Sequence, residues 1–269
     1  MAEIIAEIGI NHNGDILKAF DLIEVAIDCG CDFVKFQKRT PDLIPESQKN
    51  KIRQTPWGEM TYLEYKKKME FRESDYHCLH FYCKGHISWF TSCWDIPSVD
   101  FMEEFNVPYI KIPSACLTDD ELLKAALKTG REIILSTGMS TIGEIDHAVE
   151  ILGKPILLHC TSTYPSKTEE LNLRMIPVLK ERYGCRVGYS GHEVGLSTTV
   201  AAVAMGAGLV ERHITLDRSM WGTDHAASVE PQGLRKLVKD IRTLEKALGD
   251  GVKKVYPSEI PVKEKLRNA

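Results

Sequence analysis

Short apolar runs rich in β-branched residues alternate with amphipathic stretches along the whole sequence, and this alternation constrains the fold more than any other feature. Continuous apolar runs between helices are typical of strands buried on both faces of a parallel sheet. Strand-like runs lie at residues 4–8, 33–37, 88–92, 109–113, 132–136, 155–160, 186–190 and 209–214. Helical patterns lie at residues 16–28, 98–105, 119–128, 141–152, 172–182, 196–205 and 232–248.

Eight strand-like runs in a chain of 269 residues predict one domain, a closed (β/α)8 barrel of the TIM type. Two segments depart from the repeat. Residues 38–73 are too long for an ordinary connection and follow the second strand, on the side where such a barrel carries its active site. We therefore expect them to form a wall of that site rather than an irregular surface insertion. Residues 250–269 are predicted to form a short, extended C-terminal arm.

Charge and composition argue against several classes of protein. The net charge of −4 and the pI of about 6.2 give no electrostatic reason to expect a nucleic-acid or acidic-membrane partner. No signal-peptide pattern and no run of 18 apolar residues is found, so we expect neither secretion nor a membrane span. The eight cysteines are scattered without a CxxC pair, which predicts free thiols of a cytoplasmic protein.

Lys35 and Lys111 lie inside otherwise apolar strands, where an unpaired ammonium is not tolerated. One interpretation is a buried salt bridge with Glu7 or another acid. The interpretation that we favour is a clamp for a small phosphate or carboxylate, although a Schiff-base role for one lysine is a third option. Glu7, at the end of the first strand, is the best candidate for a general acid or base. The hydroxyls that would complete the clamp are those of Ser92, Ser114 and Ser190.

His192 and His213 are at matching ends of adjacent predicted strands. Neutral imidazole is the commonest ligand of divalent transition metals. A lone histidine is more often a core or surface residue, but two on neighbouring strand ends, beside acids and an anion site, predict a metal site. An open coordination position there would let the metal polarise a carbonyl or hold a water. His159 and His225 are weaker candidates, and His12 is expected in a loop that shapes the site.

The order of these residues resembles that of the sialic acid synthase (N-acetylneuraminate synthase) family. The resemblance covers residues 4 to about 265. Its motifs together are highly specific for the family, whereas any one of them alone would be weak evidence. The matching stretches are AEIGINHNG at 6–14, VKFQ at 34–37, YIKIPS at 109–114, IILSTGMSTIGEI at 133–145, LLHCTSTYP at 157–165, GYSGH at 188–192 and ERHITLDRSMWGTDHAASVEP at 211–231.

The resemblance implies a reaction in which phosphoenolpyruvate condenses with an aldose, typically N-acetylmannosamine or its 6-phosphate, to give a 2-keto-3-deoxy sugar acid and phosphate. It implies that Glu7, His192 and His213 are catalytic, and that the two histidines bind Mn²⁺ or Mg²⁺. The phosphoenolpyruvate contacts that it implies are Lys35, Ser92, Lys111, Ser114, Ser162 and Ser190. The sugar contacts that it implies are Gln37, Tyr164 and Asp224.

The sequence departs from the family pattern at several points. Ser114 is followed by Ala115 and Cys116 where members often have Gly-Glu, so a carboxylate near the sugar is missing. Ser92 is followed by Cys93 and Trp94 where many have Pro-Phe, and Ser162 replaces an asparagine. Many members continue into an antifreeze-like domain that is exchanged across a homodimer, and the given sequence does not include this domain. A homodimer is one expected assembly.

Two alternative functions fit the same residues. The first is a related synthase that makes an octulosonic acid or a different nonulosonic acid from a non-acylated aldose, which Cys116 and the missing domain suggest. The second is a sugar- or phosphate-binding barrel without turnover. Glu7, the two lysines and the two histidines together favour the catalytic interpretation over this second alternative.

Overall fold

The predicted strand-like runs form a closed parallel barrel in the computed structural model, which describes residues 1–267. The strands follow each other around the barrel in the order β1-β10-β9-β8-β7-β6-β5-β2, so the sheet has no free edge. The predicted (β/α)8 fold is thus confirmed. The barrel strands are β1 (Glu3–Gly9), β2 (Phe33–Lys38), β5 (Ser88–Cys93), β6 (Tyr109–Ile112), β7 (Glu132–Ser136), β8 (Ile156–Cys160), β9 (Val187–Gly191) and β10 (Leu209–His213).

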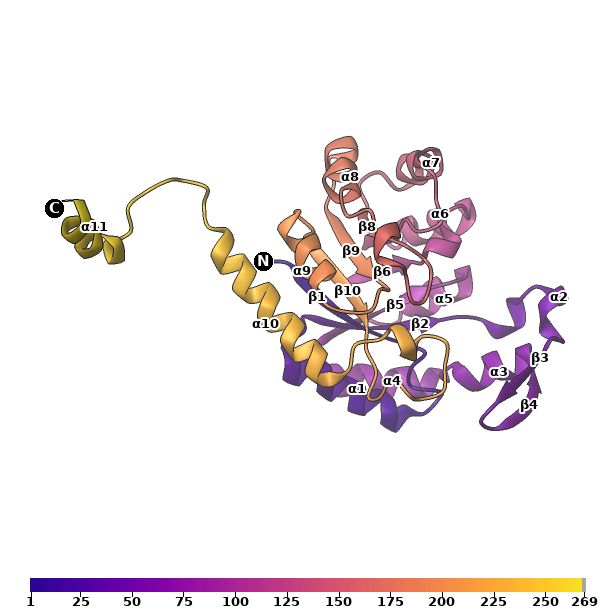
Figure 1. Cartoon of the computed structure of the whole chain (residues 1–269). Helices are drawn as coiled ribbons and strands as arrows, with labels where there is room; N and C mark the ends of the chain where they lie inside the picture. The colour runs from indigo at the N-terminus through magenta and orange to yellow at the C-terminus, as the bar shows by residue number, and fades with distance from the viewer. Residues whose placement is uncertain (268–269) are drawn as a thin grey trace.

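Helices surround the barrel and bury one face each against it (Figure 1). In α10, for example, the buried residues recur at helical spacing, which is the pattern of a helix with one apolar face. Helix α8 begins three residues later than predicted, because Asn172 adopts a positive φ of 42°. The surrounding helices are α1 (Ile16–Cys29), α4 (Glu73–Cys83), α5 (Ile96–Met102), α6 (Asp120–Lys128), α7 (Ile142–Leu152), α8 (Met175–Tyr183), α9 (Ser197–Ala204) and α10 (Pro231–Leu248).

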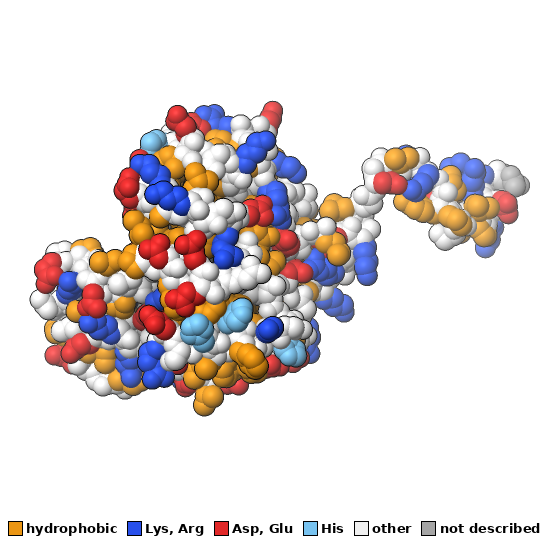
Figure 2. Space-filling view, turned by 180° about the vertical axis from the view of Figure 1, so that it is seen from behind, with side chains coloured by type: hydrophobic (Ala, Val, Ile, Leu, Met, Phe, Trp, Pro, Cys, Tyr) orange, Lys and Arg blue, Asp and Glu red, His pale blue; other side chains and the backbone are white. Residues whose placement is uncertain are grey.

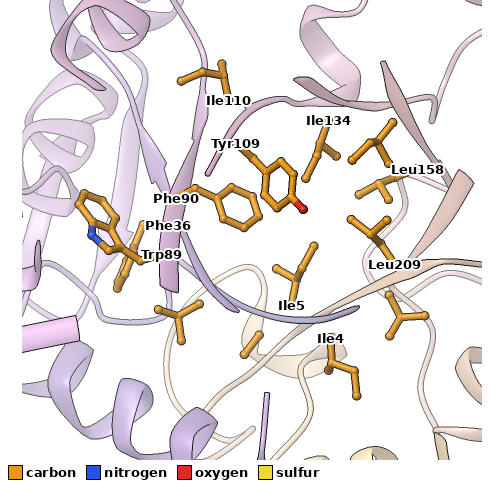
Figure 3. Close-up of a cluster of buried hydrophobic side chains, with 14 of the residues drawn as sticks. Ile4, Ile5, Phe36, Trp89, Phe90, Tyr109, Ile110, Ile134, Leu158 and Leu209 are labelled. Carbon is orange, nitrogen blue, oxygen red and sulfur yellow. The ribbon is translucent and has the colours of Figure 1, made fainter. Parts of the chain in front are cut away.

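The lower half of the barrel interior is filled by an apolar plug. Phe33, Phe90 and Tyr109 pack edge to face, with ring centroids 5.4–5.8 Å apart. Aliphatic side chains of the remaining strands, such as Ile134 and Leu209, point toward these rings (Figure 3). This plug closes the interior from below, so any cavity in the barrel opens only at the carboxyl ends of the strands.

The long segment after β2 is structured rather than irregular. It contains η1 (Pro41–Leu43), α2 (Glu46–Lys49), the antiparallel hairpin of β3 (Ile52–Thr55) with β4 (Gly58–Thr61), and α3 (Tyr62–Met69). The segment projects to one side of the barrel (Figure 1). Its buried Tyr65 packs edge to face on Trp221, in the loop after β10, with centroids 5.8 Å apart. The insertion therefore touches a loop at the carboxyl end of the barrel.

The C-terminal arm stands clear of the barrel in Figures 1 and 2. Every residue from 246 to 267 is exposed. The prediction of an extended arm is wrong beyond Tyr256, because η5 (Pro257–Glu259) and α11 (Ile260–Arg267) follow there. Pro257 at the first helical position and the backbone N–H that Tyr256 donates to the Glu259 carboxylate supply the local start signal. Residues 268–269 of the predicted arm lie outside the described part of the chain.

Two properties of the chain follow from its side chains. All eight cysteines are unpaired in the structure, as expected. No helix among residues 1–267 has the length and apolar character that crossing a bilayer requires.

Candidate functional site

The site is formed by side chains that lie two residues beyond the apolar plug along the barrel strands. Side chains of a strand alternate between its two faces, so residues i and i+2 both point into the barrel. Tyr109 belongs to the apolar plug and Lys111 lies directly above it; Phe90 and Ser92 are related in the same way. The polar layer encloses a cavity of about 160 Å³. Its lining includes Glu7, Lys35, Gln37, Ser92, Lys111, Ser114, Ser162, Tyr164, Ser190, His192 and His213.

Lys35 is at the centre of a buried polar network. Its Nζ lies 2.8 Å from Glu7 Oε2 and 3.6 Å from Glu211 Oε2, and it donates a hydrogen bond of 2.7 Å to Ser92 Oγ. Burial opposes the charge, but the carboxylates of Glu211 and Glu7 raise the pKa of Lys35 above its ordinary value. Lys35 therefore remains an ammonium, and both the salt bridge and a role as an anion contact are available to it.

Lys111 differs from Lys35 because it forms no ion pair with any residue among 1–267, although its side chain is only 2% exposed. Burial, together with the nearby Lys35 ammonium, lowers its pKa, and the more distant Glu211 only partly offsets this. A buried amine that lacks an ion-pair partner and lines a cavity is the strongest indication in the barrel of an anionic ligand.

The two carboxylates beside Lys35 have different proton affinities. Burial raises the pKa of Glu7, and the opposing effect of Lys35 does not cancel it. Glu211 is equally buried, yet Lys35 and Lys111 overcome the desolvation and lower its pKa to about 2. Ser190 Oγ also donates a 2.9 Å hydrogen bond to Glu211. Glu211 is thus fixed as an anion, whereas Glu7 is the carboxyl group suited to exchange a proton.

The serines on the far side of the cavity gather around Gly138. The Gly138 N–H donates a 3.0 Å hydrogen bond to Ser114 Oγ. A Cβ at this position would lie 2.2 Å from Ser162 Oγ and 3.0 Å from Ser114 Oγ, so only glycine lets both hydroxyls approach the turn after β7. The close approach holds two of the predicted contact hydroxyls together at one edge of the cavity.

His192 is fixed by a backbone contact on one ring nitrogen. Its Nδ1 lies 2.8 Å from the carbonyl oxygen of Thr161, to which an Nδ1–H would donate. Its Nε2 faces the cavity, 2.9 Å from Tyr164 Oη. Burial lowers the pKa of His192 to about 4, with a smaller contribution from the nearby His213, so the ring is neutral at neutral pH. A neutral imidazole with one nitrogen anchored on the backbone and the other pointing into the cavity suits a metal ligand, provided that Tyr164 Oη yields its hydrogen bond with Nε2.

His213 faces His192 across the rim, with ring centroids 5.7 Å apart. Its Nδ1 is buried and has no hydrogen-bond partner among residues 1–267; the Asp224 carboxylate lies 3.9 Å away. Asp224 itself does not line the cavity. The described residues contain no group of three or more His, Cys, Asp or Glu side chains placed to hold a metal ion. A metal here would thus rest on two protein nitrogens and take its other ligands from water or substrate.

The remaining histidine candidates lie outside the cavity. His159 Nε2 contacts the Leu171 carbonyl oxygen at 2.7 Å, and His225 Nδ1 contacts Thr215 Oγ1 at 2.7 Å. Both rings are therefore engaged in local structure. His12 is buried in the turn after β1 and stacks on Phe71 at the end of the long insertion.

The structure adds Glu211 and Ser136 to the polar layer, together with Trp94 and Met139 at its wall. The two-residue step could have identified the first two, because Glu211 follows Leu209 and Ser136 follows Ile134 in the same way that Lys111 follows Tyr109. Trp94 and Met139 follow the strands, where the step no longer applies. Asp224, which was predicted, lies in the loop after β10 and does not line the cavity, although its carboxylate is 3.9 Å from His213 Nδ1.

The fold and the site together define a class: a (β/α)8 barrel enzyme with buried lysines, carboxylates and a pair of histidines at the carboxyl ends of its strands. The chain belongs to the NeuB family, whose sequence profile matches residues 22–253. Among its relatives, the N,N′-diacetyllegionaminic acid synthase of Campylobacter jejuni is 41% identical over 95% of this chain and 80% of its own length. The human N-acetylneuraminate-9-phosphate synthase is 39% identical over 98% of this chain and 76% of its own length.

Solved structures agree with this assignment. The N-acetylneuraminic acid synthetase of Leptospira borgpetersenii superposes with a TM-score of 0.86 at 34% sequence identity, covering 100% of this chain and 93% of the other. The predicted resemblance to the sialic acid synthase family is therefore confirmed, and the chain is an enzyme of a family of synthases.

Proposed function

We propose that this enzyme condenses phosphoenolpyruvate with a six-carbon aldose to give a nine-carbon 2-keto-3-deoxy sugar acid and phosphate. The names of its relatives, which are sialic, legionaminic and pseudaminic acid synthases, support a nonulosonic acid as the product. The observation that carries the proposal is Lys111, a buried amine that has no ion pair within residues 1–267 and lines the cavity beneath two histidines. It calls for an anionic substrate at this depth.

Phosphoenolpyruvate fits the deep part of the cavity. Lys35 and Lys111 would neutralise its phosphate and carboxylate, and serine hydroxyls on opposite walls would hold the remaining oxygens. Because the lysines stay fixed while charge moves onto the departing phosphate, they would stabilise that charge without reorganisation. The hydroxyls assigned to this substrate are those of Ser92, Ser114, Ser162 and Ser190.

The rim residues fit a divalent cation, for which we propose Mn²⁺ or Mg²⁺. His192 and His213 would hold it: Nε2 of His192 points into the cavity, where its partner is Tyr164 Oη, and His213 has a buried nitrogen without a hydrogen-bond partner in the described chain. Two protein ligands leave positions open for oxygen ligands, which both ions accept. A bound cation would supply Lewis-acid polarisation of the acceptor's aldehyde.

The reaction then places distinct demands on the side chains. C3 of phosphoenolpyruvate attacks the aldehyde carbon, and positive charge develops at C2. A water adds at C2, and Glu7 is placed to take its proton because burial keeps its pKa above the ordinary value. The C2–O bond of the tetrahedral intermediate breaks, and phosphate leaves against the lysines. Gln37, Tyr164 and Asp224 are assigned to the sugar, with Tyr164 44% exposed at the mouth.

The test is phosphate release from phosphoenolpyruvate in the presence of Mn²⁺ and a panel of hexosamines, hexoses and pentoses. We expect release only when an aldose is added, with mass detection of a nine-carbon acid. The His192→Ala variant should lose at least about 100-fold in turnover while its circular dichroism stays that of the wild type. Absence of release with every acceptor would refute the proposal, and full activity of His192→Ala would refute the metal assignment.

A further inference from the structure

Three cations that take no part in the deep anion site gather at the rim. Arg39 follows β2, Arg53 lies on β3, and Lys66 lies on α3; we call these three residues the rim cation cluster. None of them forms an ion pair within 4 Å with any residue among 1–267. Of the acids around Arg39 and Lys66, Glu70 pairs with Lys38 at 2.7 Å, and Asp224 lies beyond ion-pair distance of both cations.

Arg39 connects the cluster with the cavity. Its guanidinium stacks on Trp94, with Cζ 3.3 Å from the ring centroid, and Nη2 donates a 3.0 Å hydrogen bond to Gln37 Oε1. Trp94 and Gln37 both line the cavity. The Nε of Arg39 is buried and has no hydrogen-bond partner in the described chain. The adjacent Cys116 thiol does not neutralise it, because burial raises the pKa of Cys116 to about 11.

Arg53 and Lys66 share an aromatic support. The Arg53 guanidinium lies 5.1 and 5.0 Å from the ring centroids of Tyr62 and Tyr65, and Lys66 Nζ lies 5.3 and 5.6 Å from the same rings. Burial, Arg39 and Arg53 together lower the pKa of Lys66 to about 8. The cations therefore repel one another, and the aromatic rings compensate this only in part. A ligand with two negative charges would relieve the repulsion.

The position of the cluster indicates which part of a substrate it would meet. Arg53 lines a hollow with residues 220–223, directly before Asp224, whose carboxylate is 3.9 Å from His213. The hollow is thus on the acceptor side of the cavity, away from the lysines. In the condensation proposed above, three carbons come from phosphoenolpyruvate and six from the aldose. The aldehyde end of the aldose would be at the histidines, so its other end would extend toward the rim.

We propose that the rim cation cluster binds a phosphomonoester on the terminal carbon of the acceptor, so that the enzyme uses a phosphorylated aldose and makes a product phosphorylated at C9. This inference rests on the proposed condensation. The relatives include both kinds of enzyme by name, since one is an N-acetylneuraminate-9-phosphate synthase and another an N,N′-diacetyllegionaminic acid synthase. The cluster favours the first kind for this chain.

The first measurement compares N-acetylmannosamine 6-phosphate with N-acetylmannosamine in the wild-type enzyme, with phosphoenolpyruvate and Mn²⁺ present. We expect kcat/KM to be roughly 100-fold higher for the phosphorylated acceptor, the size of effect that two charge-assisted contacts provide. Most of the difference should be in KM, because the phosphate remains distant from the reacting carbons. Equal kcat/KM values for the two acceptors would overturn the proposal.

The second measurement uses Arg53→Met and Lys66→Met, which remove one charge each and keep much of the side-chain volume. Each should lower kcat/KM for the phosphorylated acceptor roughly tenfold and leave the unphosphorylated acceptor within about twofold of the wild-type value. Lys67→Met is the matched control, because Lys67 lies on the same helix but is half-exposed and pairs with Asp42 at 2.7 Å. Equal losses on both acceptors in the two cluster variants would contradict the proposal.

Calorimetric binding separates this proposal from the condensation itself. If no acceptor supports phosphate release, the condensation fails, but titration of the protein with the two sugars still tests the cluster. Tighter binding of N-acetylmannosamine 6-phosphate that is lost in Arg53→Met and Lys66→Met supports the phosphate site. Equal affinity for both sugars overturns it whether or not the enzyme turns over.

Discussion

His12 shows how a single side chain in the turn after β1 joins the barrel to its long insertion. Its ring stacks on Phe71 with centroids 3.9 Å apart, and its Nδ1 accepts a 3.0 Å hydrogen bond from the Gly14 N–H. Burial lowers the pKa of His12 to about 3, because the imidazolium would have to form without water around it. The histidine is therefore a neutral packing element and not a proton donor of the site.

The lowered pKa of His12 predicts acid sensitivity. A histidine with an unfolded pKa near 6.5 and a folded pKa of about 3 contributes stability that is complete above the unfolded value and is lost as the pH falls. Between about pH 6 and pH 4 this loss should approach about 1.4 kcal/mol per pH unit. In His12→Gln, which keeps an acceptor but does not titrate, this component should be absent. Urea unfolding at several pH values measures the difference; parallel pH profiles of the two proteins would contradict it.

At the residue scale, Lys35 and Lys111 were conspicuous within apolar strands and pointed to the neighbouring serines. The family resemblance, rather than the residue pattern, supplied Gln37, Ser162 and Tyr164. Glu211 was not selected as a site residue, because a carboxylate near a histidine at a strand end can equally be a surface residue or a salt-bridge partner. Sequence reasoning also could not foresee that Lys35 has two carboxylate partners while Lys111 has none in the described part of the chain. The distribution of charge depends on which strands are neighbours in the closed barrel, and spacing along one strand carries no such information.

At the scale of elements, a buried ion pair joins the ends of β9 and β10. Arg212 Nη1 lies 3.3 Å from Glu193 Oε1, and both side chains are almost completely buried. Arg212 also donates hydrogen bonds of 2.6–2.8 Å to the carbonyl oxygens of Glu193 and Gly195. Glu193 follows His192 directly, and Arg212 precedes His213. The pair therefore fixes the spacing of the two strand ends that carry the proposed metal ligands.

Breaking this pair should be costly. Arg212→Met leaves the Glu193 carboxylate buried without its cation, and we expect a loss of about 3–5 kcal/mol in the free energy of unfolding. The double variant with Glu193→Gln should recover part of that loss, because no uncompensated charge remains. Denaturant titration of both variants and the wild type gives the comparison. A double variant less stable than Arg212→Met would show that the ion pair is not the source of the effect.

The barrel strands were predictable as elements because buried parallel strands read as continuous apolar runs. The hairpin of β3 with β4 was not, since its strands have four residues each and contain no buried residue that would give an apolar pattern. Helix α4 was not predicted. It directly follows the long insertion, which was recognised by its length, and no helical pattern was assigned between the insertion and the next strand. The helix of the arm buries no residue, so it lacks the apolar face that hydrophobic periodicity detects; the capping contact that precedes it lies in η5.

At the scale of the whole molecule, the barrel and the arm are energetically separate. All described residues of the arm are exposed, including the hydrophobic side chains of its helix α11, and the arm stands away from the barrel in Figure 2. Exposed residues without packing partners contribute little to the free energy of unfolding.

We therefore predict that a chain ending at Gly249 keeps the thermal stability of the full chain. The melting temperature in differential scanning calorimetry should change by less than about 2 °C, since no buried contact is lost. Both chains should be compared at equal concentrations, because an association through the arm would make the melting temperature depend on concentration. A decrease of more than about 5 °C on truncation would show that the arm packs against protein in solution.

The apolar plug beneath the lysines has a kinetic consequence. Because Phe33, Phe90 and Tyr109 close the interior from below, the cavity has one mouth, and the histidines and Tyr164 surround it. In the proposed assignment, an aldose seated at this mouth would bar the way to the lysines, whereas phosphoenolpyruvate on the lysines leaves the mouth open. In that assignment the architecture would impose an order of arrival, with phosphoenolpyruvate first and the sugar second. An aldose that arrived first would have to leave again before the reaction could begin.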